Sequence, residues 1–160
     1  MGFETPITIK KAINEIQSNS YVLPAIQREF VWSAEQIENL FDSLMRGYPI
    51  GSFLFWKVQP QRIGDFQFYR FMDHYHERDF RHNEALKPPD NREITAVLDG
   101  QQRLTALYIG LIGWYADKLR YYWWKSDTPF PKREMFINLK LRAISRSVPA
   151  VKLTYWARVA

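Results

Sequence analysis

The amino-acid sequence predicts an α+β class, a folded core and a single domain, and one observation supports each of these expectations. Helical and strand-like segments are mixed along the 160 residues without the regular rhythm of a doubly wound sheet. Hydrophobic residues make up 46% of the chain, which excludes a disordered composition and allows a buried core. The length favours one domain over residues 1–160, and the aromatic residues close to Ala160 suggest a fragment of a longer protein.

The charge of the chain is unevenly distributed. The net charge is +5, but the segment from Lys118 to Ala160 holds ten Lys and Arg residues and only two acids. This asymmetry suggests a polyanionic partner such as DNA, and a solvated basic face is the plainer alternative. With no cysteine there is no disulfide framework. We expect a cytoplasmic protein without membrane contact, because no signal peptide or long apolar run is visible.

Helical periodicity marks three segments. Apolar residues spaced at i, i+3, i+4 and i+7 predict a short helix over 8–18. Ser33, with Gln36 three residues later, forms a capping-box pattern that predicts a helix over 34–46, and Gly47 is a natural stop. A third helix is predicted after Asp99 from an apolar face made of Leu104, Leu107, Tyr108, Leu111 and Tyr115.

Strands are predicted where β-branched and aromatic residues form short runs. These runs are residues 21–23, 52–57, 65–72, 93–98 and 135–139. The polar segment 73–92 predicts a long loop or insertion. It contains His74, His76 and His82, which we interpret as solvated loop residues, with a divalent-metal site as the alternative.

The segment VLDGQQRLTAL changes from strand-like to helical at Asp99. If a helix starts at Gln101, the backbone N–H groups near residues 100–103 lack helical partners and lie at the positive end of the helix dipole. Gly100 would let a ligand approach the backbone, and Arg103 would add a planar cation. The corner therefore predicts a phosphate site. In the plainer alternative Asp99 is only an N-cap and Arg103 a surface residue.

Two further polar groups accompany this corner. Gln27 and Arg28 lie between apolar neighbours, and Arg28 could converge with Arg103 on one anion, although a salt bridge of Arg28 with Asp42 is an equal alternative. The aromatic stretch 121–124, with basic residues on both sides, could stack nucleic-acid bases. Burial of these rings in a core or against another domain is the commoner use.

The stretches LPAIQREFVWSAEQIENLFDSLMRGYPIGSFLFW and VLDGQQRLTALYIGL together resemble the N-terminal domain of GmrSD-type, modification-dependent restriction enzymes (domain-of-unknown-function family 262). The specific feature is the order of QR-x-F-x-W, PIGS and DGQQRL along the chain. The resemblance implies a ParB/sulfiredoxin-like fold, a mixed small sheet with flanking helices.

The resemblance also implies a function in defence against phage DNA. It implies a nucleotide-sensing or nucleotide-hydrolysing module, followed in longer members by a C-terminal HNH-type nuclease domain or subunit, and we expect the nucleotide to be a nucleoside triphosphate bound with Mg²⁺. No His-rich nuclease signature is visible in this chain. Carried over to this sequence, the phosphate-holding turn falls on Gly100, Gln101, Gln102 and Arg103, with Asp99 ahead of them, and Gln27 and Arg28 match the first polar motif of the family. Our leading hypothesis places catalysis on Asp99, Gln102 and Arg103, nucleotide binding on Gln27, Arg28, Gly100 and Gln101, and Mg²⁺ on Asp99. The alternatives are a DNA-binding or modification-sensing module without turnover, and a structural support for a nuclease.

Overall fold

The computed structural model describes residues 5–26, 29–88, 92–125, 129–136 and 157–158. The chain divides into two compact units. The first comprises Met1–Arg28, Phe53–Phe71 and Asn83–Gln101, and the second comprises Glu29–Ser52, Met72–His82 and Gln102–Ala160. The assignment of all 160 residues to one domain stays a prediction.

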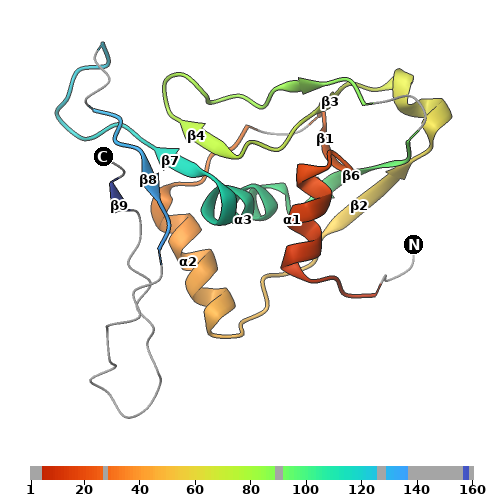
Figure 1. Cartoon of the computed structure of the whole chain (residues 1–160), viewed down its shortest axis with the longest axis horizontal. Coiled ribbons are helices and arrows are strands. Elements are labelled where there is room, and N and C mark those ends of the chain that lie inside the picture. Colours follow the sequence, from red (N-terminus) through yellow and green to blue (C-terminus); the bar gives the residue numbers. More distant parts are fainter. Residues whose placement is uncertain (1–4, 27–28, 89–91, 126–128, 137–156, 159–160) are drawn as a thin grey trace. The chain divides into compact units, whose positions relative to one another are not determined.

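The first unit contains a five-stranded mixed sheet with the strand order β2-β6-β1-β3-β5 (Figure 1). Its strands are β1 (Tyr21–Pro24), β2 (Leu54–Val58), β3 (Phe68–Tyr69), β5 (Ala85–Leu86) and β6 (Ile94–Asp99). β1 and β6 are parallel, whereas β2 pairs with β6, β3 with β1, and β5 with β3 in antiparallel fashion. The interior strand β6 ends at Asp99, the point where the chain leaves this sheet.

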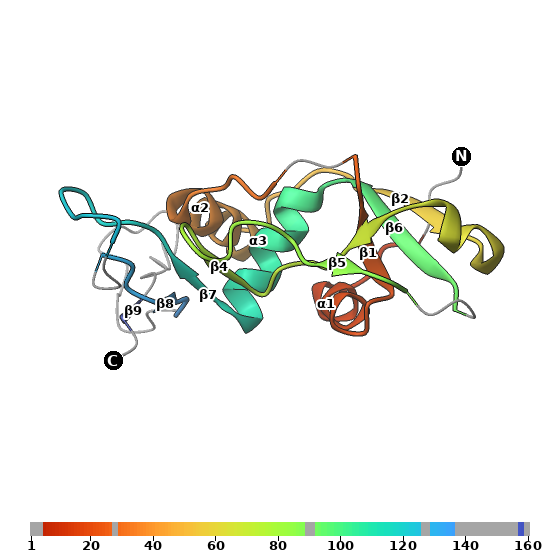
Figure 2. The same ribbon diagram turned by 90° about the horizontal axis from the view of Figure 1, so that it is seen from above.

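Two helical segments accompany this sheet. Helix α1 (Ile9–Gln17) lies beside β1 and buries Ala12, Ile13 and Ile16 (Figure 2). The 3-10 helix η1 (Pro60–Asp65) follows β2 and buries Ile63. One buried core cluster of the unit contains Val22, Val58, Ile63, Phe68, Ile94 and Ala96. Its small, β-branched and aromatic side chains suit a sheet surface.

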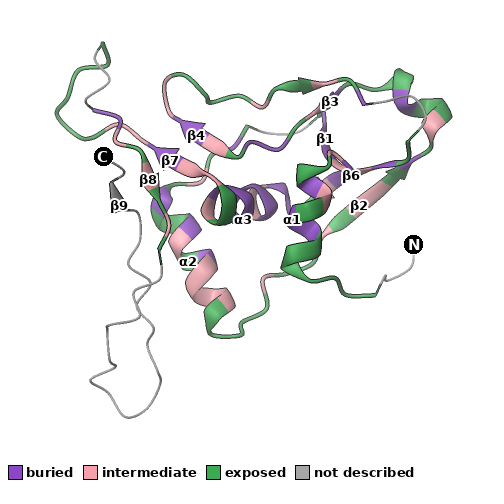
Figure 3. Ribbon diagram, in the orientation of Figure 1, coloured by how far each residue is buried: buried purple, intermediate pink, exposed green. Residues whose placement is uncertain are grey.

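The second unit contains helix α2 (Ala34–Met45), nearly all of helix α3 (Gln101–Ile112) and a small sheet of order β4-β7-β8-β9. The strands are β4 (His74–His76), β7 (Trp114–Ala116), β8 (Arg133–Glu134) and β9 (Ala157–Arg158). Residues 104–109 of α3 are all buried (Figure 3), so this helix is an interior element rather than an amphipathic surface helix.

The α+β class is confirmed, and the ParB/sulfiredoxin-like topology stays a prediction. The helices predicted at 8–18, at 34–46 and after Asp99 are present as α1, α2 and α3. The capping box is formed as expected: Ser33 N–H donates to Gln36 Oε1 over 2.9 Å, and Gln36 N–H donates to Ser33 Oγ over 3.3 Å. The strands expected at 21–23, 52–57 and 93–98 appear as β1, β2 and β6.

Several boundaries were wrong. Segment 73–92 is no simple loop, because it contributes β4 to one sheet and β5 to the other. Within 65–72 only Phe68–Tyr69 is a strand. The strand β8 lies just before the one expected at 135–139, of which residues 135 and 136 are not in a strand and residues 137–139 lie outside the described part. Tyr115 lies in β7 rather than on the face of α3, because α3 ends at Ile112, and Leu111, within α3, is exposed.

Within the described residues, no helix is long and apolar enough to cross a membrane.

Candidate functional site

The predicted corner between strand and helix is present. β6 ends at Asp99, α3 begins at Gln101, and Gly100 joins them with a φ of 87°. This left-handed conformation favours glycine, and glycine has no side chain with which to cap the first N–H groups of the helix. The first turn of α3 contains no acidic residue that would neutralise the helix dipole. The exposed carboxylate of Asp99 lies directly before the corner in the chain.

The side chain of Gln101 stabilises the turn between β6 and α3 through a bond to β6. This side chain is buried, and its Nε2 donates a hydrogen bond to the carbonyl oxygen of Val97, within the same unit. A buried amide without such a partner would cost stability, so this bond locks the direction in which the chain leaves β6. The side chain predicted to touch nucleotide therefore stabilises the turn.

Gln102 holds a second segment with both ends of its amide. Its Nε2 donates to the carbonyl oxygen of Glu29 over 2.9 Å, and its Oε1 accepts from the N–H of Val31 over 3.0 Å. The amide thus pairs with the backbone of 29–31 as a neighbouring strand would. Gln27 and Arg28 directly precede this anchored backbone in the chain, but they lie outside the described residues.

The guanidinium of Arg103 is hydrogen-bonded to the loop that carries the PIGS sequence. Its Nη1 donates to the carbonyl oxygen of Ile50 and its Nη2 donates to that of Ser52 over 2.7 Å. Gly51, between them, has a φ of 86°, and a Cβ atom there would come within 2.5 Å of Nη1. The planar guanidinium fork fits this bent backbone, and glycine is required where the two approach each other.

The three consecutive polar side chains of the corner therefore each hold a different backbone segment. Gln101 secures the end of β6, Gln102 secures the stretch after Arg28, and Arg103 secures the PIGS loop. The start of α3 thereby connects the three sequence motifs QR-x-F-x-W, PIGS and DGQQRL. The alternative partner suggested for Arg28, Asp42, forms an ion pair with Arg46 over 2.7 Å.

The histidines do not form a metal site in the described part of the chain, where no three potential ligands come together. His74 contacts Asp73, and His82 Nδ1 lies 2.8 Å from Glu29 Oε1. His76 is buried, so its interpretation as a solvated loop residue was wrong. The N–H groups of residues 78 and 79 both donate to His76 Nδ1, which therefore carries a lone pair and closes a tight turn.

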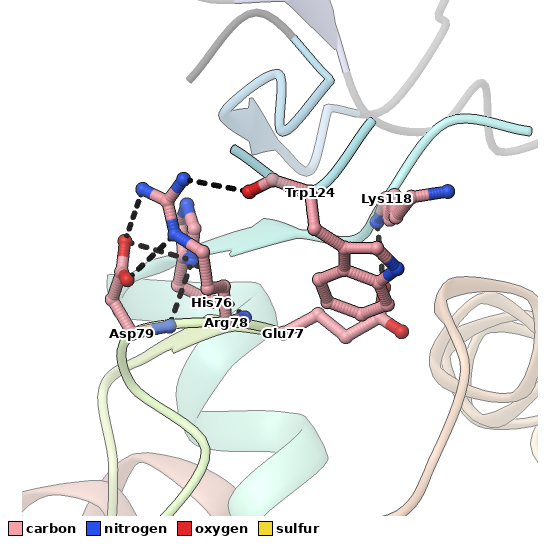
Figure 4. A network of polar contacts seen from close by, with 6 residues as sticks. All are labelled: His76, Glu77, Arg78, Asp79, Lys118 and Trp124. Carbon is pink, nitrogen blue, oxygen red and sulfur yellow. Dashed lines mark hydrogen bonds and ion pairs between the residues drawn. The ribbon is translucent and has the colours of Figure 1, made fainter. Parts of the chain in front are cut away.

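This turn after β4 supports a loop between β7 and β8 (Figure 4). Glu77 Oε2 accepts from the N–H of Lys118 over 2.7 Å, and Arg78 Nη1 donates to the carbonyl oxygen of Trp124 over 3.2 Å. Arg78 also pairs with Asp79, and this hydrogen bond lowers the pKa of the Asp79 carboxyl. Sequence reasoning missed the roles of Glu77 and Arg78, because nothing in a polar stretch of mixed charge indicates its partner 41 or 46 residues away.

The loop held by this turn, residues 118–125, presents aromatic rings to solvent. The exposed fraction is 99% for Tyr121 and 84% for Trp123, and about half of Tyr122 and Trp124 is also exposed. Burial of these rings in a core, the commoner use that we named, is therefore not what this chain does with Tyr121 and Trp123. Their function has to be sought at the surface.

Comparisons with known proteins agree with the motifs. Residues 9–152 match the family model described as GmrSD restriction endonuclease, N-terminal domain. An uncharacterized protein of Methanocaldococcus jannaschii, MJ0686, is 32% identical over 101 residues, which cover 62% of this chain. The chain spans 16% of the length of that relative.

Proposed function

The chain belongs to the family of GmrSD restriction endonuclease N-terminal domains, and from that premise we propose that it binds the triphosphate of a nucleotide at the start of α3. The observation that carries the proposal is the corner itself. Gly100, with a φ of 87°, directly precedes the first backbone N–H groups of an interior helix whose first turn carries no acidic side chain. Such groups, at the positive end of a helix, are suited to hold phosphate oxygens.

The side chains around the corner have distinct roles in this proposal. Arg103 contributes positive charge next to the phosphates while its guanidinium keeps the PIGS loop in place. Arg28 would neutralise further phosphate charge. We assign the orientation of an attacking water to Gln27 rather than Gln102, because both amide atoms of Gln102 bond to the backbone of residues 29–31.

Asp99 is the proposed partner of Mg²⁺. Mg²⁺ is usually held by one or two carboxylates together with phosphate oxygens and water, so it needs no cage of protein ligands. A single exposed carboxylate directly before the corner fits this donor set. The metal would neutralise charge on the phosphates, and hydrolysis would depend on positioning and electrostatic stabilisation.

We further propose that the domain regulates a DNA-cutting partner, expected to be an HNH-type nuclease domain or subunit, in a restriction system that acts on modified DNA. The family assignment supports this setting. A DNA-binding or modification-sensing module without turnover is the second candidate function, and the exposed aromatic and basic loop at 118–125 favours it. The two candidates are compatible if nucleotide and DNA use different surfaces.

Calorimetric titration of the full chain with ATP or GTP tests the nucleotide proposal. We expect binding that depends on Mg²⁺ in the wild type and is lost or at least tenfold weaker in Asp99→Asn, which preserves size but removes the charge; tenfold corresponds to about 1.4 kcal/mol. Arg62→Ala, which removes an exposed arginine from η1, serves as the control and should bind normally. Absence of binding in the wild type, or equal binding by Asp99→Asn, would refute the proposal.

A further inference from the structure

We propose that the loop 118–125, called here the aromatic loop, is a binding surface for unpaired nucleic-acid bases. Its sequence, KLRYYWWK, places four consecutive rings between cations and contains no acid. Base stacking on aromatic side chains, combined with cations that follow the phosphate backbone, is the usual way in which proteins hold single-stranded nucleic acid.

The exposure of the rings is the first argument. Tyr121 and Trp123 project almost completely into solvent, with 99% and 84% of their surface exposed. Folding gains nothing from rings in this position, since the hydrophobic contribution requires burial. Two large exposed rings separated by one residue are therefore better explained by a ligand with flat apolar faces.

The backbone of Tyr121 is the second argument. Its φ is 70°, a left-handed conformation that bulky residues rarely adopt. Strained backbone of this kind tends to occur at binding sites, where the surrounding structure maintains it. Here the strain directs an aromatic side chain outward instead of into the protein.

The support beneath the loop is the third argument. Two consecutive residues of the turn after β4 hold its two ends: Glu77 accepts from the N–H of Lys118, and Arg78 donates to the carbonyl of Trp124 (Figure 4). The N–H of Leu119 also donates to the carbonyl of Pro129 over 2.8 Å. A loop fixed at both ends loses less conformational entropy on binding, so the rings are preorganised.

Charge identifies the partner. Lys118, Arg120 and Lys125 lie within the loop, while the nearby acid Asp79 is paired with Arg78 and Asp117 is paired with Arg133. The Nζ of Lys118 lies 5.4 Å from the centre of the Trp124 ring, which leaves its charge on the same face as the rings. Positive charge combined with exposed rings fits a polyanion that carries flat bases, and fits an apolar protein surface poorly.

The test compares two labelled strands of equal length, a single-stranded oligothymidylate and its abasic counterpart, by fluorescence anisotropy with the full chain. The two strands carry the same phosphates but differ in bases. We expect the wild type to prefer the strand with bases by at least about tenfold, since one stacked base is worth about five- to a hundredfold in affinity. The double variant Tyr121→Ala/Trp123→Ala should bind both strands equally.

Three further variants separate this proposal from the others. Tyr48→Ala removes an exposed ring of 59% exposure elsewhere in the same unit and should keep the preference. Arg120→Ala should weaken binding of both strands and lower the salt dependence of log Kd by about 0.7, as expected for one lost phosphate contact. Asp99→Asn should leave oligonucleotide binding intact, so this proposal and the nucleotide proposal can fail independently.

Three results would overturn the proposal. If the wild type bound both strands with equal affinity, the loop would contact phosphates but no bases. If the double variant still preferred the strand with bases, the bases would bind at another site of the chain. The third result is that the wild type binds neither strand but self-associates in sedimentation velocity, and that the double variant does not self-associate. The aromatic loop would then be a protein interface.

Discussion

The guanidinium of Arg103 lies so close to Gly51 that a Cβ atom on this glycine would come within 2.5 Å of Nη1. Gly51→Ala should therefore displace Arg103 from the carbonyl groups of Ile50 and Ser52, in addition to straining a backbone with a φ of 86°. We expect a loss of about 2–4 kcal/mol in the free energy of unfolding, from left-handed strain of about 1–2 kcal/mol and the lost hydrogen bonds. Urea denaturation measures it.

Gly47→Ala is the matched control for this variant, because Gly47 has a similar φ of 73° but no atom near the position of a Cβ. The difference between the two variants isolates the contact with Arg103. If Gly51→Ala costs no more than Gly47→Ala, or if the difference persists in an Arg103→Ala background, the guanidinium does not hold this loop.

Gln102→Glu should destabilise the segment after Arg28. The carboxylate can still accept from the N–H of Val31, but its other oxygen would face the carbonyl of Glu29 in place of a donor. We expect a loss of about 1–3 kcal/mol, since one hydrogen bond is lost and a repulsive contact replaces it. Hydrogen exchange at Val31 should become faster in the variant, and unchanged exchange there would contradict the proposed anchoring.

Gly113→Ala should be among the most damaging substitutions in the chain. A Cβ atom at this position would overlap the backbone carbonyl of Asp73, which cannot move away as a flexible side chain can. We expect a loss of about 3 kcal/mol or more, since overpacking against backbone costs at least 1–3 kcal/mol. Gly64→Ala, with open space around the new methyl group, should change the unfolding free energy by less than about 1 kcal/mol. Equal thermal stability of the two variants would be inconsistent with the close approach.

Glu38 makes the stability of the chain depend on pH in a defined direction. Burial raises the pKa of this carboxyl above 4.5, against the attraction of Arg133. As the pH rises through 4.5 the unfolded chain loses this proton before the folded chain does, so the contribution of Glu38 to stability falls and stays lower above the folded pKa. Glu38→Gln should therefore be more stable than the wild type at pH 7 and lose this advantage below 4.5. Denaturant titrations across this pH range measure the difference in unfolding free energy between the variant and the wild type. A difference that does not change with pH would disprove the assignment.

The sequence predicted elements that depend on neighbouring residues better than strands that depend on pairing with distant segments. The capping box at Ser33 and the start of α3 at Gln101 depend on neighbouring residues, and both are present. β4 and β5 were missed because each is held by pairing with strands distant in the sequence. Tyr115 was placed on the helix because its spacing continued the apolar pattern, whereas the close approach of Gly113 to the carbonyl of Asp73, just after the end of α3, is visible only in three dimensions.

The candidate site shows the same division. The type and spacing of residues in DGQQR predicted a strand-to-helix corner, which the structure contains, and the left-handed conformation of Gly100 is a finding of the structure. The specific bonds of Gln101, Gln102 and Arg103 to three separate backbone segments could not be predicted, because they depend on where the chain returns. The roles of Asp99, Gln102 and Arg103 in catalysis, and of Gln27, Arg28, Gly100 and Gln101 in nucleotide binding, stay predictions.

The most direct measurement of the central claim is a series of two-dimensional ¹H–¹⁵N NMR spectra of the full chain with increasing Mg·ATP. If the start of α3 holds the phosphates, the backbone amide resonances of Gln101, Gln102 and Arg103 will shift together and saturate with one Kd, and inorganic tripolyphosphate will reproduce the shifts. If these three amides remain in place while nucleotide binds or fails to bind, the corner is only a structural joint between strand and helix.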